Sequence, residues 1–341
     1  MHRWSSAVIL VACLAALAAC GDSLPRDPLD GGATPDAPAA DAPAADAPPP
    51  DAAPDAQPSD ATADAAPPDS SPPGPVTLRF VAANLTSGPS QRYEDAGIHI
   101  LQALHPDIAL VQEMNSGDNS PTAIRSFVDT VFGSEFTYYR EEIRGIPNGI
   151  VSRYPIVASG SWDQPQITDR ELAWARIDVP GDVDLWAVSV HLKATAGSRG
   201  RRVAEAQALV AAVQAEVPPG DYLVIGGDFN TYSRTPGPSP GEPCLAELAA
   251  IVDVAGPWPA DAAGDDDTNG PRSTPYDWIL FDADLGAHAV PARVGAAVYD
   301  HGLVFDSRVF TPLGDVAPVR FEDSAAANMQ HMAVVRDVRL P

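Results

Sequence analysis

From residue 76 onward, short apolar runs alternate with polar and turn-forming residues. The runs are rich in β-branched residues and stop at polar or turn-forming positions, a pattern typical of buried strands. Seven of them lie at 76–83, 107–112, 148–153, 184–190, 221–225, 279–281 and 332–335. Apolar residues recur at helical spacing in 92–104 and 199–217, which predicts two amphipathic helices. Strands that alternate with helices predict an α/β domain.

Six polar residues stand at the ends of the predicted strands. Four follow an apolar run within three residues and two precede one within two residues: Asn84, Glu113, His191 and Asp228, and then Asp277 and His331. If the last strands run antiparallel to the others, all six side chains meet at one edge of the sheets. Any one of them alone would be read as a turn residue or an ordinary histidine. Six polar residues at corresponding strand ends together predict a polar cleft.

These positions resemble the signatures of the endonuclease/exonuclease/phosphatase family, the deoxyribonuclease I-like superfamily. The matching segments are, in order, Asn84, Gln112-Glu113, Ser189-Val190-His191-Leu192-Lys193, Gly227-Asp228-Phe229-Asn230, Tyr276-Asp277-Trp278-Ile279-Leu280 and His331. The match extends from about Leu78 to Val338. The resemblance implies a four-layer α/β sandwich, in which helices flank two packed mixed sheets. It also implies Mg²⁺-dependent cleavage of phosphate esters.

The resemblance also implies roles for these residues. Asn84 and Glu113 would form a metal site, and Asp228 would bind a second cation or orient the attacking water. Mg²⁺ prefers oxygen ligands and keeps several waters, so one or two carboxylates suffice, and Mn²⁺ or Ca²⁺ would also suit such ligands. His331 would act as base or transition-state stabiliser, with its tautomer fixed by Asp277.

Two more residues join the expected site by the same resemblance. Asn230 would hydrogen-bond phosphate or Asp228, and His191 would contact phosphate or protonate the leaving group. In deoxyribonuclease-like relatives a glutamate orients this histidine. Either Glu141 or Glu142 stands at about the right place for that role.

One position departs from the family pattern. Relatives usually carry Asp immediately before the last His, whereas this chain has Gln330 before His331. Glutamine forms hydrogen bonds but brings no charge, so the site has one fewer possible anionic ligand; Asp323 or a water could compensate. The alternatives are a working site with weaker metal affinity and a degenerate, non-catalytic copy.

The net charge of the chain limits the classes of substrate that it can bind. The chain has 21 basic and 46 acidic residues and a net charge of −25. A protein that holds duplexes on a basic face needs many Lys and Arg, so that class is excluded, whereas an enzyme that binds phosphate through a metal is not. Lys193, Arg202 and Arg272 are the candidates for direct phosphate contact. The acidic run 265–267 would repel a polyanion, and it could bind Ca²⁺ or form a solvated turn.

Three functions remain open for the domain. The first choice is a nuclease-type phosphodiesterase that acts on DNA or RNA. The second is a phospholipase C-like or sphingomyelinase-like enzyme or a small-molecule phosphatase, for which Trp162 and Trp258 are the candidate membrane-contacting aromatics. The third is a non-catalytic surface protein on the same fold. We expect a monomer.

The N-terminus has the composition of an export signal. Residues 1–19 carry a short positive start and an apolar run that is too short to span a membrane. The run ends in Leu17-Ala18-Ala19-Cys20, which resembles a bacterial lipoprotein signal with Cys20 as the lipidated residue; the alternative is an ordinary secretory signal. Residues 20–75, rich in Pro, Ala and Asp, predict a disordered tether. The domain would then occupy 76–341, exported and anchored at the periplasmic face or the cell surface.

Overall fold

The computed structural model describes residues 74–142 and 145–341. The predicted signal peptide, Cys20 and the predicted tether up to residue 73 lie outside the described residues. Within the described part of the chain, no helix is both long enough and apolar enough to cross a membrane.

The first sheet has seven strands and contains both ends of the domain. Its strands are β1 (Val76–Ala83), β2 (Ile108–Val111), β3 (Thr137–Arg140), β4 (Gly149–Ser152), β10 (Ala289–Val290), β13 (Leu303–Phe305) and β14 (Ala333–Leu340). They follow the order β10-β14-β1-β2-β4-β3, and β13 also pairs with β14. At the centre, β1 runs parallel to β2 and antiparallel to β14.

The second sheet has five strands in the order β5-β6-β7-β8-β9. They are β5 (Ile156–Trp162), β6 (Leu172–Ile177), β7 (Leu185–His191), β8 (Tyr222–Asp228) and β9 (Asp277–Phe281). β7 and β8 are parallel, and β9 is antiparallel to β8. A separate hairpin consists of β11 (Ala292–Val294) and β12 (Ala297–Tyr299).

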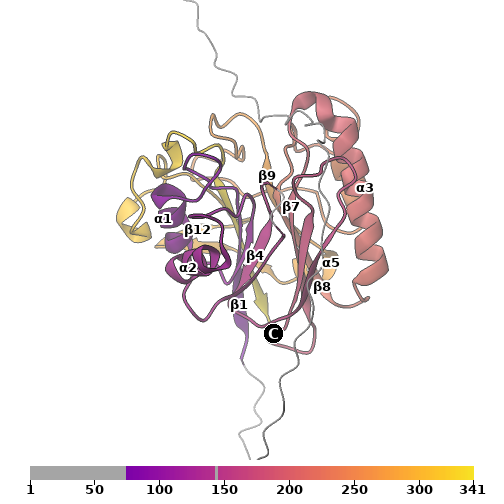
Figure 1. The fold of residues 1–341 in the computed structure, drawn as a ribbon, viewed down its shortest axis with the longest axis horizontal. Helices are drawn as coiled ribbons and strands as arrows, with labels where there is room; N and C mark the ends of the chain where they lie inside the picture. Colours follow the sequence, from indigo (N-terminus) through magenta and orange to yellow (C-terminus); the bar gives the residue numbers. More distant parts are fainter. Residues whose placement is uncertain (1–73, 143–144) are drawn as a thin grey trace, which may run out of the picture. The chain divides into compact units, whose positions relative to one another are not determined.

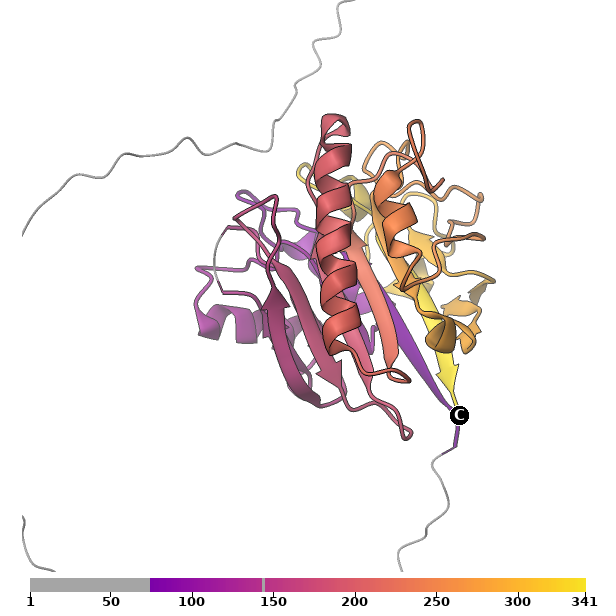
Figure 2. The same cartoon turned by 90° about the vertical axis from the view of Figure 1, so that its right-hand side faces the viewer.

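Helices cover the outer faces of both sheets. The helices are α1 (Asp95–Leu104), α2 (Pro121–Val131), α3 (Arg199–Glu216), α4 (Pro243–Leu248) and α5 (Ala283–Gly286), with 3₁₀ turns η1 (Ala196–Ser198), η2 (Leu313–Val316) and η3 (Asp323–Ala325). Figure 1 shows α1 and α2 on the side of the first sheet and α3 on the side of the second. Figure 2 shows α3 lying along the outer face of the second sheet.

Three apolar clusters fill the spaces between these layers. One packs α1 and α2 on the first sheet, through residues such as Leu101 and Val81. A second lies between the sheets and includes Phe80. A third packs α3 and α4 on the second sheet, through residues such as Leu209 and Val188. Phe80 and its neighbour Val81 face different clusters because side chains alternate along a strand. The predicted four-layer α/β sandwich is confirmed.

Candidate active site

All six polar residues from the predicted strand ends meet at one edge of the sandwich. β9 and β14 run antiparallel to the strands that carry the other residues, as the prediction required. Within the second sheet, Asp228 is in register with His191 on one side and with Asp277 on the other. All six side chains are buried. The cleft therefore gathers residues from both sheets.

Asp228 is the centre of this group. Its Oδ2 lies 3.3 Å from Asn84 Nδ2, 3.1 Å from Asn230 Nδ2 and 3.2 Å from His191 Nε2. His331 Nε2 is 3.6 Å away, and the backbone N–H of Asn230 donates to Oδ1 at 2.8 Å. Asn230 thus binds the carboxylate, which is one of the two roles expected for it.

Burial raises the pKa of Asp228 to about 7. The positive charge of His331 opposes this increase, and the carboxylates of Asp277 and Glu113 add to it. A carboxyl group with this pKa exchanges a proton near neutral pH, which is the range required of a general base.

His331 forms a pair with Asp277. Its Nδ1 lies 2.9 Å from Asp277 Oδ2. Burial disfavours the charged imidazolium, but the carboxylates of Asp277 and Asp228 outweigh it and raise the pKa of His331 to about 10. The imidazolium suits the role of transition-state stabiliser better than that of base.

His191 is neutral, in contrast to the His331 imidazolium. Burial, with the positive charges of Arg170 and His331, lowers the pKa of His191 well below its ordinary value, so the ring is neutral at pH 7. Neither candidate glutamate forms a hydrogen bond or an ion pair with it in the described residues. Glu141 is buried and accepts hydrogen bonds from the backbone and side chain of Asn148, and Glu142 is exposed. The expectation that one of them orients His191 is therefore wrong.

Asn84 and Glu113 have the features that a hard cation requires. Glu113 Oε1 lies 3.4 Å from Asn84 Nδ2 and accepts a hydrogen bond from Gln91 at 3.0 Å, while Oε2 accepts one from Thr86 at 2.9 Å. Asn84 Oδ1 is buried and has no hydrogen-bond partner among the described residues. An unpartnered amide oxygen and a carboxylate on contacting side chains are the kinds of oxygen ligand that Mg²⁺ prefers. The residues fit a divalent cation.

Backbone strain accompanies this cluster. Glu113 has φ 52° and Asn230 has φ 50°, both in the left-handed region. Such conformations cost of order 1–3 kcal/mol in non-glycine residues and gather at functional sites. Asp228, Asp277 and His331 also place ligand atoms within 4.8 Å of one another, which keeps a second cation at Asp228 open.

Two of the three expected phosphate contacts are engaged elsewhere. Lys193 is half-buried and forms no ion pair with a described residue. Arg202 is fully buried, where it binds Glu242 at 3.1 Å and donates to the carbonyls of Lys193 and Thr195 at 3.0 and 2.9 Å. The expectation that Arg202 binds phosphate is wrong; it anchors the segment that follows β7.

Arg272 is also neutralised. Its guanidinium lies 3.0 Å from Asp261, 3.3 Å from Asp265 and 3.2 Å from Asp306. This arginine joins loops through these carboxylates, an arrangement that does not support the expected contact with phosphate. The acidic run 265–267 takes part in this pairing, since Arg272 binds its first residue and Arg234 lies 3.2 Å from Asp266.

The structure adds Arg170 and Tyr276 to the site, to which the sequence analysis assigns no role. Arg170 is buried and donates to the carbonyls of His191 and Leu192 at 2.6 and 3.1 Å. The ring of Tyr276 lies 5.7 Å from that of His331. Tyr276 was within the matched motif, but Arg170 lies beside β6, a strand that the apolar pattern did not predict.

Gln330 is not part of this buried polar cluster. Its side chain is exposed, whereas His331 beside it is buried. Its carbonyl accepts a hydrogen bond from Gly270 at 2.7 Å. Asp323 does not replace the anionic ligand that is missing at position 330, because it pairs with His99 at 3.1 Å between α1 and η3.

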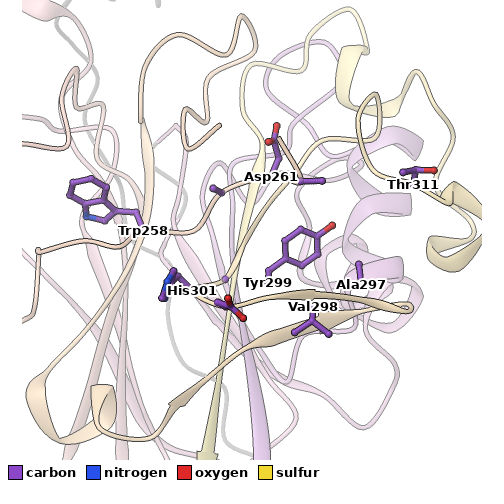
Figure 3. Close-up of a pocket in the computed structure, with 11 residues that line it drawn as sticks. Trp258, Asp261, Ala297, Val298, Tyr299, His301 and Thr311 are labelled. Atoms are coloured by element: carbon purple, nitrogen blue, oxygen red, sulfur yellow. The ribbon is translucent and has the colours of Figure 1, made fainter. Parts of the chain in front are cut away.

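A separate hollow of about 460 Å³ lies outside this cluster. Its lining includes Trp258, Asp261, Tyr299 and His301, and none of the six strand-end residues (Figure 3). Asp261 is already held by an arginine there. The hollow is distinct from the site described above.

Comparison with known proteins supports the same fold. An endonuclease/exonuclease/phosphatase from Beutenbergia cavernae DSM 12333 is 17% identical, and the alignment covers 77% of this chain and 72% of that chain, with a TM-score of 0.52. The human Nocturnin catalytic domain with bound sulfate is 16% identical, with coverage of 78% and 95% and a TM-score of 0.51. At these identities the likeness shows the fold alone.

No curated protein matches the chain. The family model described as "Endonuclease/Exonuclease/phosphatase family" matches residues 98–307, which is more than half of the sequence. These residues include four of the six strand-end side chains. The chain therefore belongs to the endonuclease/exonuclease/phosphatase family.

Proposed function

We propose that this protein is a metal-dependent phosphodiesterase of nuclease type, with Mg²⁺ as its cation. The family's members hydrolyse phosphate esters, so the reaction class follows from membership. The observation that carries the metal dependence is the buried Asn84 Oδ1, which has no hydrogen-bond partner among the described residues and belongs to a side chain whose Nδ2 lies 3.4 Å from Glu113 Oε1. A divalent cation held by these two residues would relieve the negative charge on the phosphoryl oxygens.

The remaining steps belong to the chain's own residues. Asp228 takes a proton from the attacking water at its Oδ2, because its pKa of about 7 is matched to neutral pH. His331, as an imidazolium, stabilises the charge that develops on the phosphoryl oxygens, and Asp277 holds its ring in place. His191 Nε2 lies 3.2 Å from Asp228 Oδ2. Its low pKa does not favour the alternative role of proton donor to the leaving group.

A small phosphodiester is the second candidate substrate. Arg202 and Arg272 are occupied by carboxylates, so a long polyanion finds few free cations beside the cleft. A sphingomyelinase-like function has less support, since Trp162 is buried and Trp258 is partly buried. We further propose, from the sequence alone, that the protein is exported, lipidated at Cys20 and monomeric.

A panel of phosphoesters tests the proposed function. The full-length protein is assayed with Mg²⁺, Mn²⁺ or Ca²⁺ on DNA, RNA, bis(p-nitrophenyl) phosphate, p-nitrophenyl phosphate and sphingomyelin vesicles. We expect diester cleavage that chelation abolishes and that His331→Ala reduces by on the order of 10²–10⁴-fold. Cleavage that persists in a chelator, or in His331→Ala at the wild-type rate, would contradict the proposal.

A further inference from the structure

The proposed site is divided between the two sheets. Asn84 and Glu113 follow β1 and β2 of the first sheet. His191, Asp228 and Asp277 lie on β7, β8 and β9 of the second sheet. Their mutual distances therefore depend on how closely the two sheets approach under the cleft.

A polar link crosses the space between the sheets at this point. Gln112 Nε2 donates to Ser189 Oγ at 2.9 Å, and Ser189 Oγ donates in turn to the carbonyl of Val111 at 3.2 Å. Both side chains are fully buried. Gln112 precedes Glu113 by one residue and Ser189 precedes His191 by two. The link thus joins the two strands that carry these site residues.

Two glycines bring the third site strand to the same point. A Cβ on Gly227 would lie 2.5 Å from Gln112 Nε2, and a Cβ on Gly226 would lie 2.5 Å from Leu110 Cδ1. Side chains of the first sheet therefore occupy the space that side chains on β8 would need. The amide of Gln112 packs directly against Gly227, the residue before Asp228. The φ of 137° at Gly227 and the Val190 carbonyl, which a Cβ there would overlap, favour glycine at the same position.

The link is not arranged for maximal stability. Gln112 Oε1 is buried and has no hydrogen-bond partner among the described residues. Gln112 Nε2 also donates to the carbonyl of Leu110 at 3.1 Å. A buried polar atom without a partner lowers the stability of the folded state and offsets part of what these hydrogen bonds contribute, so an apolar side chain of the same shape should change the stability little. We propose that Gln112 and Ser189 are positioning residues that set the spacing of the two sheets beneath the site.

The kcat and KM measurements in the test rest on the proposed function. The Mn²⁺ affinity and the thermal unfolding measurements do not require the protein to cleave a diester. Gln112→Met replaces the amide with an apolar side chain of similar length, and Ser189→Ala removes the hydroxyl. Leu185→Met is the matched control, because Leu185 lies in the same inter-sheet interior at the opposite end of β7. For each full-length variant we would measure thermal unfolding, kcat and KM for a diester, and Mn²⁺ affinity by electron paramagnetic resonance.

We expect Gln112→Met to keep the unfolding temperature and KM while kcat falls by about 10- to 100-fold, because misplacements of about 1 Å have effects of that order. Mn²⁺ affinity should weaken several-fold, and adding Ser189→Ala should lower kcat little further, because the two residues act as one unit. Leu185→Met should change neither kcat nor Mn²⁺ affinity.

Three outcomes would overturn the proposal: a lower unfolding temperature with unchanged kcat, an equal loss of kcat in Leu185→Met, or unchanged Mn²⁺ affinity together with unchanged kcat. If the wild type cleaves no phosphoester but Gln112→Met still weakens Mn²⁺ binding, the proposed function fails and the positioning role stands.

Discussion

Replacing Asp277 with asparagine tests the electrostatic basis of the site. Asp277→Asn keeps an oxygen that can accept the hydrogen bond from His331 Nδ1, now 2.9 Å from the carboxylate, but it removes the charge. At roughly 4 Å between charge centres and an effective dielectric near 20, the lost attraction is about 4 kcal/mol. That energy corresponds to a decrease of about 3 in the pKa of His331.

The assay is an NMR titration of the histidine ring protons in the presence of a chelator. The His331 resonance is identified by its loss in His331→Gln. We expect the wild-type ring to titrate with a pKa near 10 and the Asp277→Asn ring with a pKa near 7. Asp323→Asn is the control, since Asp323 pairs with His99 and should leave the His331 titration unchanged. A wild-type pKa near the ordinary histidine value, unmoved in Asp277→Asn, would refute the reasoning.

Four further predictions follow from the same geometry. Glu113→Gln removes an anionic oxygen and should raise the half-saturating Mg²⁺ concentration by at least about 10-fold in a steady-state assay. The pKa values of Asp228 and His331 both lie above those of the unfolded chain, so the metal-free protein should lose stability as pH rises from about 4 to 10, and urea unfolding would show this. Arg202→Met removes the buried one of the two arginines that pair with Glu242 and should destabilise the fold by up to about 3–5 kcal/mol, measured by urea unfolding; unchanged stability would contradict its anchoring role. Gln330→Asp should change Mg²⁺ half-saturation less than about 3-fold, because this side chain is exposed.

The strands that carry the site were predictable because their signals are local. β1, β2, β4, β7, β8, β9 and β14 each coincide with an apolar run that a turn or polar residue ends. β5 escaped the prediction because it is an edge strand in which Ser159, Gly160 and Ser161 interrupt the apolar run. α2 had a readable signal, since Ser120 caps its first turn, Pro121 opens it and apolar residues follow at helical spacing.

The cations near the site were not predictable in the same way. A side chain at the end of a strand is placed by that strand, whereas an arginine's role depends on which carboxylates the fold brings to it. Glu242 lies 40 residues from Arg202 in sequence, and Asp306 lies 34 residues from Arg272. Nothing in the neighbouring sequence indicates either pair. The sequence shows the positive charge but not its neutralisation.

Because Arg202 and Arg272 are neutralised, this acidic protein would have to bind phosphate through other positive charges. Arg202 and Arg272 stabilise loops, so on the proposed function the attraction for a phosphate comes from the cation at Asn84 and Glu113 and from the His331 imidazolium. Both charges lie inside the cleft, where the low dielectric strengthens their effect and salt screens it little. Duplex binding through surface arginines would instead weaken steeply with salt. Affinity for a phosphodiester should therefore depend strongly on divalent cation and weakly on ionic strength.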